Sequence, residues 1–364
     1  MKNTSIFSIF FAFSLLFLVL GMSFFGMLNY FFNLNNENSY IVVVTFFTII
    51  FFIGVLRKKI NIQINNYLRF FIILFIIVTF SFLFNSEGDF AQRKYLLFFC
   101  SGFLLTLFSS SIKVESYNFI YIQFIIYSIL NFIFLSALLI NIQDVEIYRW
   151  TLIKEFNMDV IYFSRSLGLG IIASFFYFKN KIYLLIISIS LFYLMYLLNE
   201  IGPILAVFVC ILMFYSRKNK KYFFASTFLS LLLFINIITI YIPDLSIENI
   251  INDPRVEIYS RNAGYFTENP IIGIGVAGII HIQGHYQSAH NIIIEIATEY
   301  GFLGLIPFMI MIFILFNKFI KNKNLSFSYI WLYSFIIVQF SGDISLNSLF
   351  WFVSAVYMII PKKQ

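Results

Sequence analysis

The sequence predicts an all-α polytopic membrane protein with about twelve transmembrane helices and one large outer loop at residues 243–301. Hydrophobic residues make up 61% of the 364 positions and charged residues only 11%. The mean hydropathy is +0.90. A soluble globular domain is about half apolar and about a quarter charged, so this composition excludes soluble, disordered and fibrous proteins.

Polar segments divide the chain into twelve apolar runs, which we take as the transmembrane helices because a span needs about 20 apolar residues. The runs lie at residues 5–28, 40–56, 68–84, 95–112, 118–140, 161–178, 182–198, 202–216, 222–242, 302–317, 326–340 and 348–360. The chain then divides into nine helices in residues 1–242, the outer loop in 243–301, and three helices with a short tail in 302–364.

The basic residues predict the orientation. With the N-terminus in the cytoplasm, 17 of the 24 lysines and arginines fall in inner segments, in agreement with the positive-inside rule. Both termini are then cytoplasmic, and the loop at 243–301 is on the outer side. This asymmetry accounts for the net charge of +7. No basic stripe with exposed aromatic residues points to nucleic acid.

The two cysteines, Cys100 and Cys210, both lie within apolar runs. Neither a disulfide framework nor a thiolate metal site is therefore expected. The first apolar run is longer than that of a secretory signal and has no small-x-small cleavage site, so we expect an uncleaved first helix.

The outer loop is polar, rich in turn residues and contains all three histidines of the chain. A proline directly after Asp253 predicts a helix start, with the aspartate as N-cap. This helix is expected to run to about Glu268, where an Asn-Pro pair stops it. A glycine-rich turn follows, and a second helix is expected to start near His290 and to continue into the next span.

Gly273, Gly275 and Gly278 spell G-x-G-x-x-G, the fingerprint of dinucleotide-binding folds. No strand precedes them and no βαβ unit fits into the loop. We therefore expect a tight turn that uses glycine for positive φ, with a backbone nest for phosphate as the alternative.

The histidines differ in position. His281 and His285 are four residues apart and could share a helix face, but flanking glycines argue against a regular helix and no H-E-x-x-H pattern accompanies them. We expect both to be solvated, with a metal site as the less favoured alternative. His290 opens the helix that re-enters the membrane. Imidazole titrates near neutral pH, so His290 is the natural candidate for a general base acting on a hydroxyl.

Charged residues provide further candidates. Arg165 lies near the outer end of the sixth span, where an intramembrane cation points to function, although its side chain could also reach the interface. Glu200, between the seventh and eighth spans, is similar. Arg255 and Arg261 in the loop could be solvated or paired with acidic neighbours. Arginine is nevertheless suited to gripping a diphosphate through paired donors.

Several of these segments follow one another in a characteristic order. The chain has Arg255, then N-P-I-I-G-I-G at 269–275, then His290-Asn291, and then E-Y-G-F-L-G at 299–304 before a span. This order resembles the O-antigen polymerase and O-antigen ligase superfamily, in which an arginine precedes an N-P-x-x-G-x-G turn, followed by H-N and E-x-G-x-x-G. The resemblance covers residues 255–304 and the many-span architecture.

The resemblance implies roles for single residues. Arg255 matches the loop arginine that is expected to bind a lipid-linked diphosphate, and His290 matches the histidine proposed as catalytic. Arg165 resembles a second arginine near the outer end of a mid-chain span. The family's S-R-G-P segment is N-E-I-G-P here, with Ile201 in place of the arginine, so Arg261 or Arg165 would supply that charge. Further candidates in the matching segments are Asn291, Glu299 and Glu200.

The resemblance also implies a function. It implies an inner-membrane glycosyltransferase that polymerises undecaprenyl-diphosphate-linked repeat units of O-antigen or a related surface polysaccharide at the periplasmic face. The reaction would invert the anomeric centre and need neither a metal ion nor a cofactor. The expected partners are the lipid-linked glycan, the bilayer, and a chain-length regulator and a flippase of the same pathway. The alternatives are an O-antigen ligase, which transfers the glycan to lipid A core, and a flippase or transporter.

Overall fold

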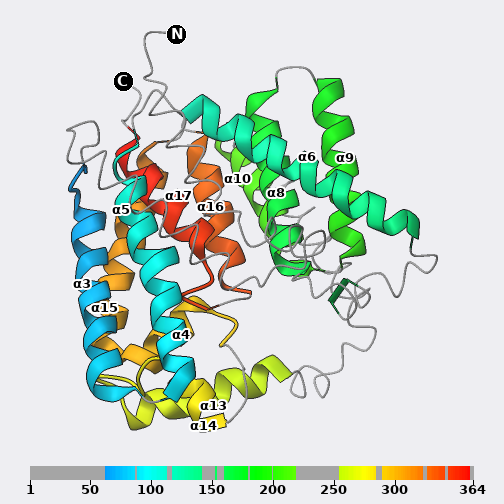
Figure 1. Cartoon of the computed structure of the whole chain (residues 1–364). Coiled ribbons are helices and arrows are strands. Elements are labelled where there is room, and N and C mark those ends of the chain that lie inside the picture. Colours follow the sequence, from blue (N-terminus) through cyan, green and yellow to red (C-terminus); the bar gives the residue numbers. More distant parts are fainter. Residues whose placement is uncertain are drawn as a thin grey trace, which may run out of the picture.

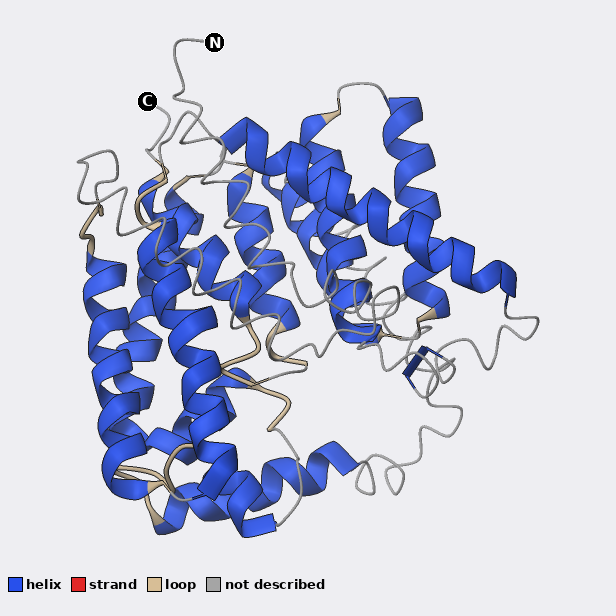
Figure 2. Cartoon of the chain, in the orientation of Figure 1, coloured by secondary structure: helices blue, strands red, loops and turns tan. Residues whose placement is uncertain are grey.

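The structure is a computed structural model that describes residues 62–86, 88–112, 117–141, 152–153, 160–178, 181–198, 200–218, 254–283, 289–322, 326–340 and 343–360. Within these residues every regular element is a helix, as the sequence predicts, and the helices pack into a bundle (Figure 1, Figure 2). The spans expected at 5–28, 40–56 and 222–242 lie outside the described residues.

Four described helices are long and apolar enough to cross a membrane. They are α3 (Asn66–Asn85), α6 (Tyr117–Asn141), α8 (Val160–Tyr177) and α15 (Ile292–Lys321). The first three agree closely with the spans predicted at 68–84, 118–140 and 161–178. Helix α15 contains both the second loop helix and the span predicted at 302–317.

The shorter apolar helices also fall where the sequence predicts them. They are α9 (Lys181–Leu197), α10 (Ile201–Lys218), α16 (Phe327–Ile337) and α17 (Ser348–Ile359). Helices α16 and α17 have only 11 and 12 residues. At about 1.5 Å per residue each covers little more than half of the roughly 30 Å hydrocarbon layer. The segment that joins them, residues 338–340 and 343–347, therefore lies inside the bundle (Figure 1). We call it the α16–α17 corner.

The span predicted at 95–112 starts earlier and is not one regular helix. It consists of α4 (Gly88–Phe98), the π-helical segment η1 (Phe99–Leu104) and α5 (Leu105–Ser109). The sequence placed the boundary at residue 95 because Lys94 is charged. In the structure Lys94 is buried and paired with two glutamates of α15, so the helix continues through it.

Contacts between helix ends define one end of the bundle. The backbone N–H of Gln63 donates to Ser110 O at 3.1 Å. The hydroxyl of Tyr121 lies 2.9 Å from that of Ser326. Lys318 Nζ donates to three carbonyls in the last turn of α17, at 2.6 to 2.8 Å. These contacts join the start of α3 to the end of α5, the start of α6 to the start of α16, and the end of α15 to the end of α17. The two members of each pair lie on the same side in the predicted alternation of spans.

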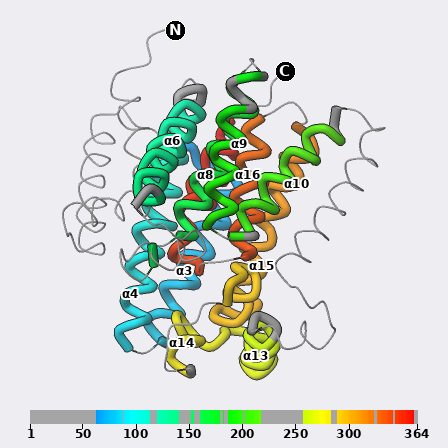
Figure 3. The backbone as a smooth tube through the Cα atoms, turned by 90° about the vertical axis from the view of Figure 1, so that its right-hand side faces the viewer, coloured from blue at the N-terminus to red at the C-terminus, as the bar shows by residue number. Residues whose placement is uncertain are grey.

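The loop helices lie at the opposite end. Helix α13 (Pro254–Glu268) and helix α14 (Gly278–Gln283) sit beside the α3–α4 connection (Figure 1, Figure 3). There Asn85 Nδ2 donates to Gly273 O at 3.0 Å, and Val276 N donates to Ser86 Oγ at 2.7 Å. This end is the one that the sequence predicts to be outer.

Candidate functional site

The first loop helix, α13, has the bounds that the sequence predicts, although Asp253, the expected N-cap, lies outside the described residues. Helix α13 packs on the first part of α15, where Thr298 Oγ1 lies 3.3 Å from Asn262 O. The short helix α14 was not expected, because the neighbouring glycines argued against a regular helix. It carries His281, which is exposed.

The described residues offer no site for the metal ion that was considered as an alternative role for the loop histidines. In that part of the chain no group of three His, Cys, Asp or Glu side chains could share an ion. His285 lies outside the described residues.

The glycine-rich turn wraps around a break in α15. Gly301 has φ 59° and is not helical, so α15 consists of two helical segments that meet at this residue. The N–H of Gly275 donates to Glu299 O at 3.0 Å, and the N–H of Phe302 donates to Pro270 O at 2.7 Å. The N-P-x-x-G-x-G and E-x-G-x-x-G segments of the sequence are therefore two halves of one packed unit.

The backbone N–H groups of this turn donate hydrogen bonds to acceptors of the protein itself. The N–H groups of Gly273, Ile274, Gly275 and Gly278 donate to backbone carbonyls, and that of Val276 donates to Ser86 Oγ. A dinucleotide site or a phosphate nest requires such donors to face a ligand. The turn is thus structural, as the favoured prediction stated, although only Gly273 and Gly275 of the three glycines have positive φ.

We expect Gly275→Ala to destabilise the protein by roughly 2–4 kcal/mol, since the change combines a left-handed backbone with overpacking. Gly275 has φ 91°, and a Cβ there would overlap Asn85 O. The melting temperature of the detergent-solubilised protein measures the effect. Gly264→Ala in α13 is the matched control, because nothing lies within 4 Å of its Cβ position. Equal melting temperatures for the two variants would contradict the packing described here.

The second loop helix starts where the sequence predicts. Asn291 is the N-cap of α15, and its side chain accepts from Ile293 N at 3.0 Å and from Ile294 N at 3.1 Å. Asn291 therefore has a structural role, and a direct role in chemistry stays a prediction. His290 precedes the cap, is half-buried and has φ 52°. A non-glycine residue in this left-handed region costs of order 1 kcal/mol or more, so the surrounding structure must hold it there. Any role of His290 in chemistry stays a prediction.

The start of α15 adjoins the α16–α17 corner. The backbone N–H two residues after His290 donates to Val338 O at 3.3 Å. On another side, a Cβ on Gly202 would lie 2.8 Å from Phe340 Cβ, so the first turn of α10 packs closely on the corner. Glu200, which is half-buried, directly precedes this turn. The corner therefore brings together the segments that carry His290 and Glu200.

Arg165 reaches the same corner from α8. Its side chain is 5% exposed, and Nη1 donates to Asn347 Oδ1 at 3.1 Å. Tyr333 of α16 donates its hydroxyl to Arg165 O at 2.8 Å, and the guanidinium lies 5.7 Å from the ring centre of Tyr162. Arg165 thus faces the bundle interior, and the alternative in which it reaches the membrane interface does not apply.

The two loop arginines both lie on α13. Arg255 lies in the first turn of α13, and its side chain is outside the described part. Arg261 Nη2 lies 3.6 Å from Glu257 Oε1 one turn earlier on the same helix, and its side chain is 36% exposed. Of the two arginines considered for the charge missing at Ile201, the structure brings Arg165 to the corner.

Glu299 belongs to a buried ion-pair cluster that the sequence did not reveal. Lys94 Nζ lies 2.5 Å from Glu295 Oε1 and 2.7 Å from Glu299 Oε1, and all three side chains are almost fully buried. Glu299 therefore ties α15 to α4, and any contact of Glu299 with a substrate stays a prediction.

The corner residues Asp343 and Asn347 were also missed. The available signal was the polar segment S-G-D-I-S-L-N at 341–347, placed between two apolar runs that are both short for a span.

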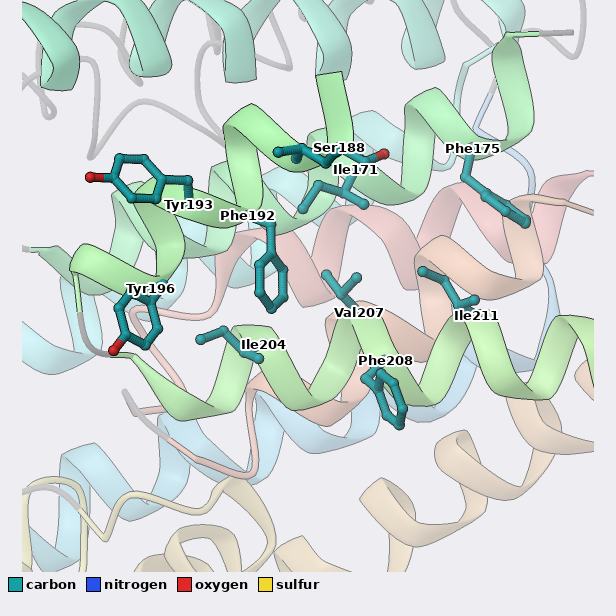
Figure 4. Close-up of a pocket in the computed structure, with 11 residues that line it drawn as sticks. Ile171, Phe175, Ser188, Phe192, Tyr193, Tyr196, Ile204, Val207, Phe208 and Ile211 are labelled. Atoms are coloured by element: carbon teal, nitrogen blue, oxygen red, sulfur yellow. The ribbon is translucent and has the colours of Figure 1, made fainter. Parts of the chain in front are cut away.

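An apolar groove of about 520 Å³ lies between α8, α9 and α10. Figure 4 shows side chains from all three helices converging on it, among them Ile171, Phe192, Ile204 and Val207. Ile204 is one turn beyond Glu200, and Ile171 is six residues beyond Arg165 on α8. The groove therefore starts close to the polar corner.

A bundle of apolar helices, with a buried arginine at the α16–α17 corner and a histidine at the start of a helix that adjoins the corner, defines a membrane protein with polar groups between its helices. Residues 182–309 match the family model described as O-antigen ligase. This match confirms the resemblance to the O-antigen polymerase and ligase superfamily, whose members are glycosyltransferase-like enzymes. It includes Arg255 and His290 but not Arg165. No curated protein matches the chain.

Proposed function

We propose that the protein is an inner-membrane glycosyltransferase that polymerises undecaprenyl-diphosphate-linked repeat units at the periplasmic face. The main support for the proposal is that two segments meet the α16–α17 corner. Arg165 contacts the corner through Asn347, and the start of α15, which follows His290, adjoins it. A buried cation suits a diphosphate leaving group, and an imidazole suits a hydroxyl nucleophile. The match of residues 182–309 to the O-antigen ligase family supports this chemistry.

In the proposed reaction the donor is the growing glycan on its lipid diphosphate, and the acceptor is a hydroxyl of a new lipid-linked repeat unit. His290 accepts the hydroxyl proton as the oxygen attacks the anomeric carbon. The bond from that carbon to the diphosphate breaks, and Arg255 and Arg165 stabilise the departing charge. The attack inverts the anomeric centre. The donor already has its leaving group, so the reaction needs neither a cofactor nor a metal ion.

The groove between α8, α9 and α10 suits the isoprenoid chain of such a donor. Its lining is almost entirely apolar, with Ile171, Phe192 and Val207 among the contributing side chains. Arg165 is six residues before Ile171, which is about 9 Å along a helix. A diphosphate at the corner could therefore place its lipid in this groove.

Arg255→Lys should remove most of the activity. A bidentate guanidinium grips a diphosphate through two parallel donors, whereas the ammonium of lysine is a point charge. Chain length of the polysaccharide, read on a gel at equal protein level, measures the effect. Arg261→Lys is the matched control on the same helix and should be milder, because Arg261 is paired with Glu257. Long polymer from the Arg255→Lys protein would show that Arg255 does not bind the diphosphate and is a solvated loop residue.

The proposal includes a topology of twelve spans, with cytoplasmic termini and the loop at 243–301 in the periplasm. The 17 to 7 division of basic residues motivates it. Reporter fusions after Lys59, Lys221 and Lys323 should report cytoplasm, and a fusion near Gln283 should report periplasm. A cytoplasmic signal near Gln283 would contradict both the topology and the proposed chemistry.

The lipopolysaccharide made by a deletion strain distinguishes a polymerase from the alternative functions. Lipopolysaccharide with a single repeat unit is expected if the protein is the polymerase. Loss of all capped core would instead indicate an O-antigen ligase. Failure of lipid-linked units to reach the periplasm would indicate a flippase or transporter. A chain-length regulator and a flippase of the same pathway are the proposed protein partners.

A further inference from the structure

The α16–α17 corner is non-helical backbone in the interior of a membrane protein. Such backbone is tolerated only where it is buried in the protein, with its polar groups hydrogen-bonded, or where it lines a water-filled cavity. Asp343 Oδ1 accepts from Ser345 N at 2.8 Å, from Ser345 Oγ at 2.6 Å and from Leu346 N at 2.9 Å. Trp351 Nε1 donates to Ile344 O at 2.9 Å. Residues 343–347 of the corner therefore form an internally hydrogen-bonded turn.

Helix α15 and helix α4 fix the position of this turn. Ile344 N donates to Glu295 Oε2 at 2.9 Å, while the other oxygen of Glu295 lies 2.5 Å from Lys94 Nζ. Ser101 Oγ of η1 donates to Ser345 O. The corner is thus anchored on two sides by groups that belong to other helices.

Asn347 is the residue through which the corner contacts Arg165. It is 1% exposed, its Nδ2 donates to Asp343 O at 2.7 Å, and its Oδ1 accepts from Arg165 Nη1 at 3.1 Å. The bond to Asp343 fixes which way the amide points. An amide oxygen that is itself held in place orients the guanidinium that donates to it.

We propose that Asn347 is a positioning residue for Arg165, and that the Lys94–Glu295 pair holds Asn347 in place through the α16–α17 corner. The bond to Asn347 thereby gives the guanidinium of Arg165 a fixed direction. The effect of Asn347 on catalysis rests on the proposed function. Its effect on the orientation of Arg165 can be tested without any transferase activity.

The first test measures how fast phenylglyoxal, an arginine-specific reagent, modifies Arg165 in the full-length protein in detergent, read by peptide mass spectrometry. Asn347→Ala should raise the rate several-fold. Asn131→Ala is the matched control, because this buried asparagine donates to Ser166 Oγ, the neighbour of Arg165, at 2.6 Å. The control should leave the rate unchanged. An unchanged rate in Asn347→Ala would overturn the proposal.

The second test is a double-mutant cycle on glycosyl transfer in proteoliposomes. Asn347→Ala alone should lower kcat by about 10- to 100-fold, the usual cost of a misplaced group, with little change in KM for the acceptor. In the Arg165→Ala background it should have no further effect. Additive losses together with a lower melting temperature would show a structural role and overturn the proposal. If Asn347→Ala speeds the labelling of Arg165 but the wild-type protein has no transferase activity, the positioning is supported and the proposed function is contradicted.

Discussion

His290→Asn should lower the rate of glycosyl transfer by about 10² to 10⁴-fold, the usual contribution of a general base, without loss of stability. His290 has φ 52°, and asparagine tolerates this left-handed conformation better than alanine does. The side chain is half-buried before the N-cap of α15, so little packing is lost. Polymer length at equal protein level and the melting temperature are the two measurements.

His281→Asn is the control, because His281 is exposed on α14. It should retain long-chain polymer. Normal polymer from a well-expressed His290→Asn protein would contradict the assignment of the base. If the variants at His281, His285 and His290 were equally inactive and the activity of the wild type depended on added divalent metal, a metal site would be favoured over a general base.

Lys94→Met should destabilise the protein by roughly 3–5 kcal/mol, the usual cost of removing one partner from a buried ion pair. The change leaves Glu295 and Glu299 buried without their cation, at a point where α4, α15 and the α16–α17 corner meet. A clear fall in melting temperature and in membrane protein level is therefore expected.

Arg93→Met is the control for this prediction, because Arg93 is the preceding residue of α4 and is exposed. Its melting temperature should equal that of the wild type. A Lys94→Met protein as stable as Arg93→Met would show that the cluster does not hold the two helices together.

Helices with uniform apolar runs could be predicted from the sequence almost to their ends. Helix α6 is the clearest example, since its polar flanks mark both boundaries. Helix α4 could not be placed correctly, because a charged residue inside an apolar run reads as a loop unless its partners are known. The partners of Lys94 are about 200 positions away in the chain, on α15, and no local pattern reveals them.

The site was predictable where its signals are local. Asn291 is a typical N-cap, so the start of α15 beside His290 follows from the sequence. The inward direction of Arg165 does not, because a cation near a span end can equally reach the interface. The burial of its side chain and its bond to Asn347 decide between the two. The structural role of Gly275 is likewise set by the close approach of Asn85.

Reconstitution of the purified full-length protein in liposomes, with a synthetic undecaprenyl-diphosphate-linked oligosaccharide as both donor and acceptor, would show directly whether the protein is a polymerase. The products are resolved by mass spectrometry. We expect lipid-linked chains of two and more repeat units together with released undecaprenyl diphosphate, in the absence of added metal or nucleotide. Absence of such chains from the wild-type protein, or polymer that forms equally with the Arg165→Ala and His290→Asn double variant, would contradict a polymerase with this site.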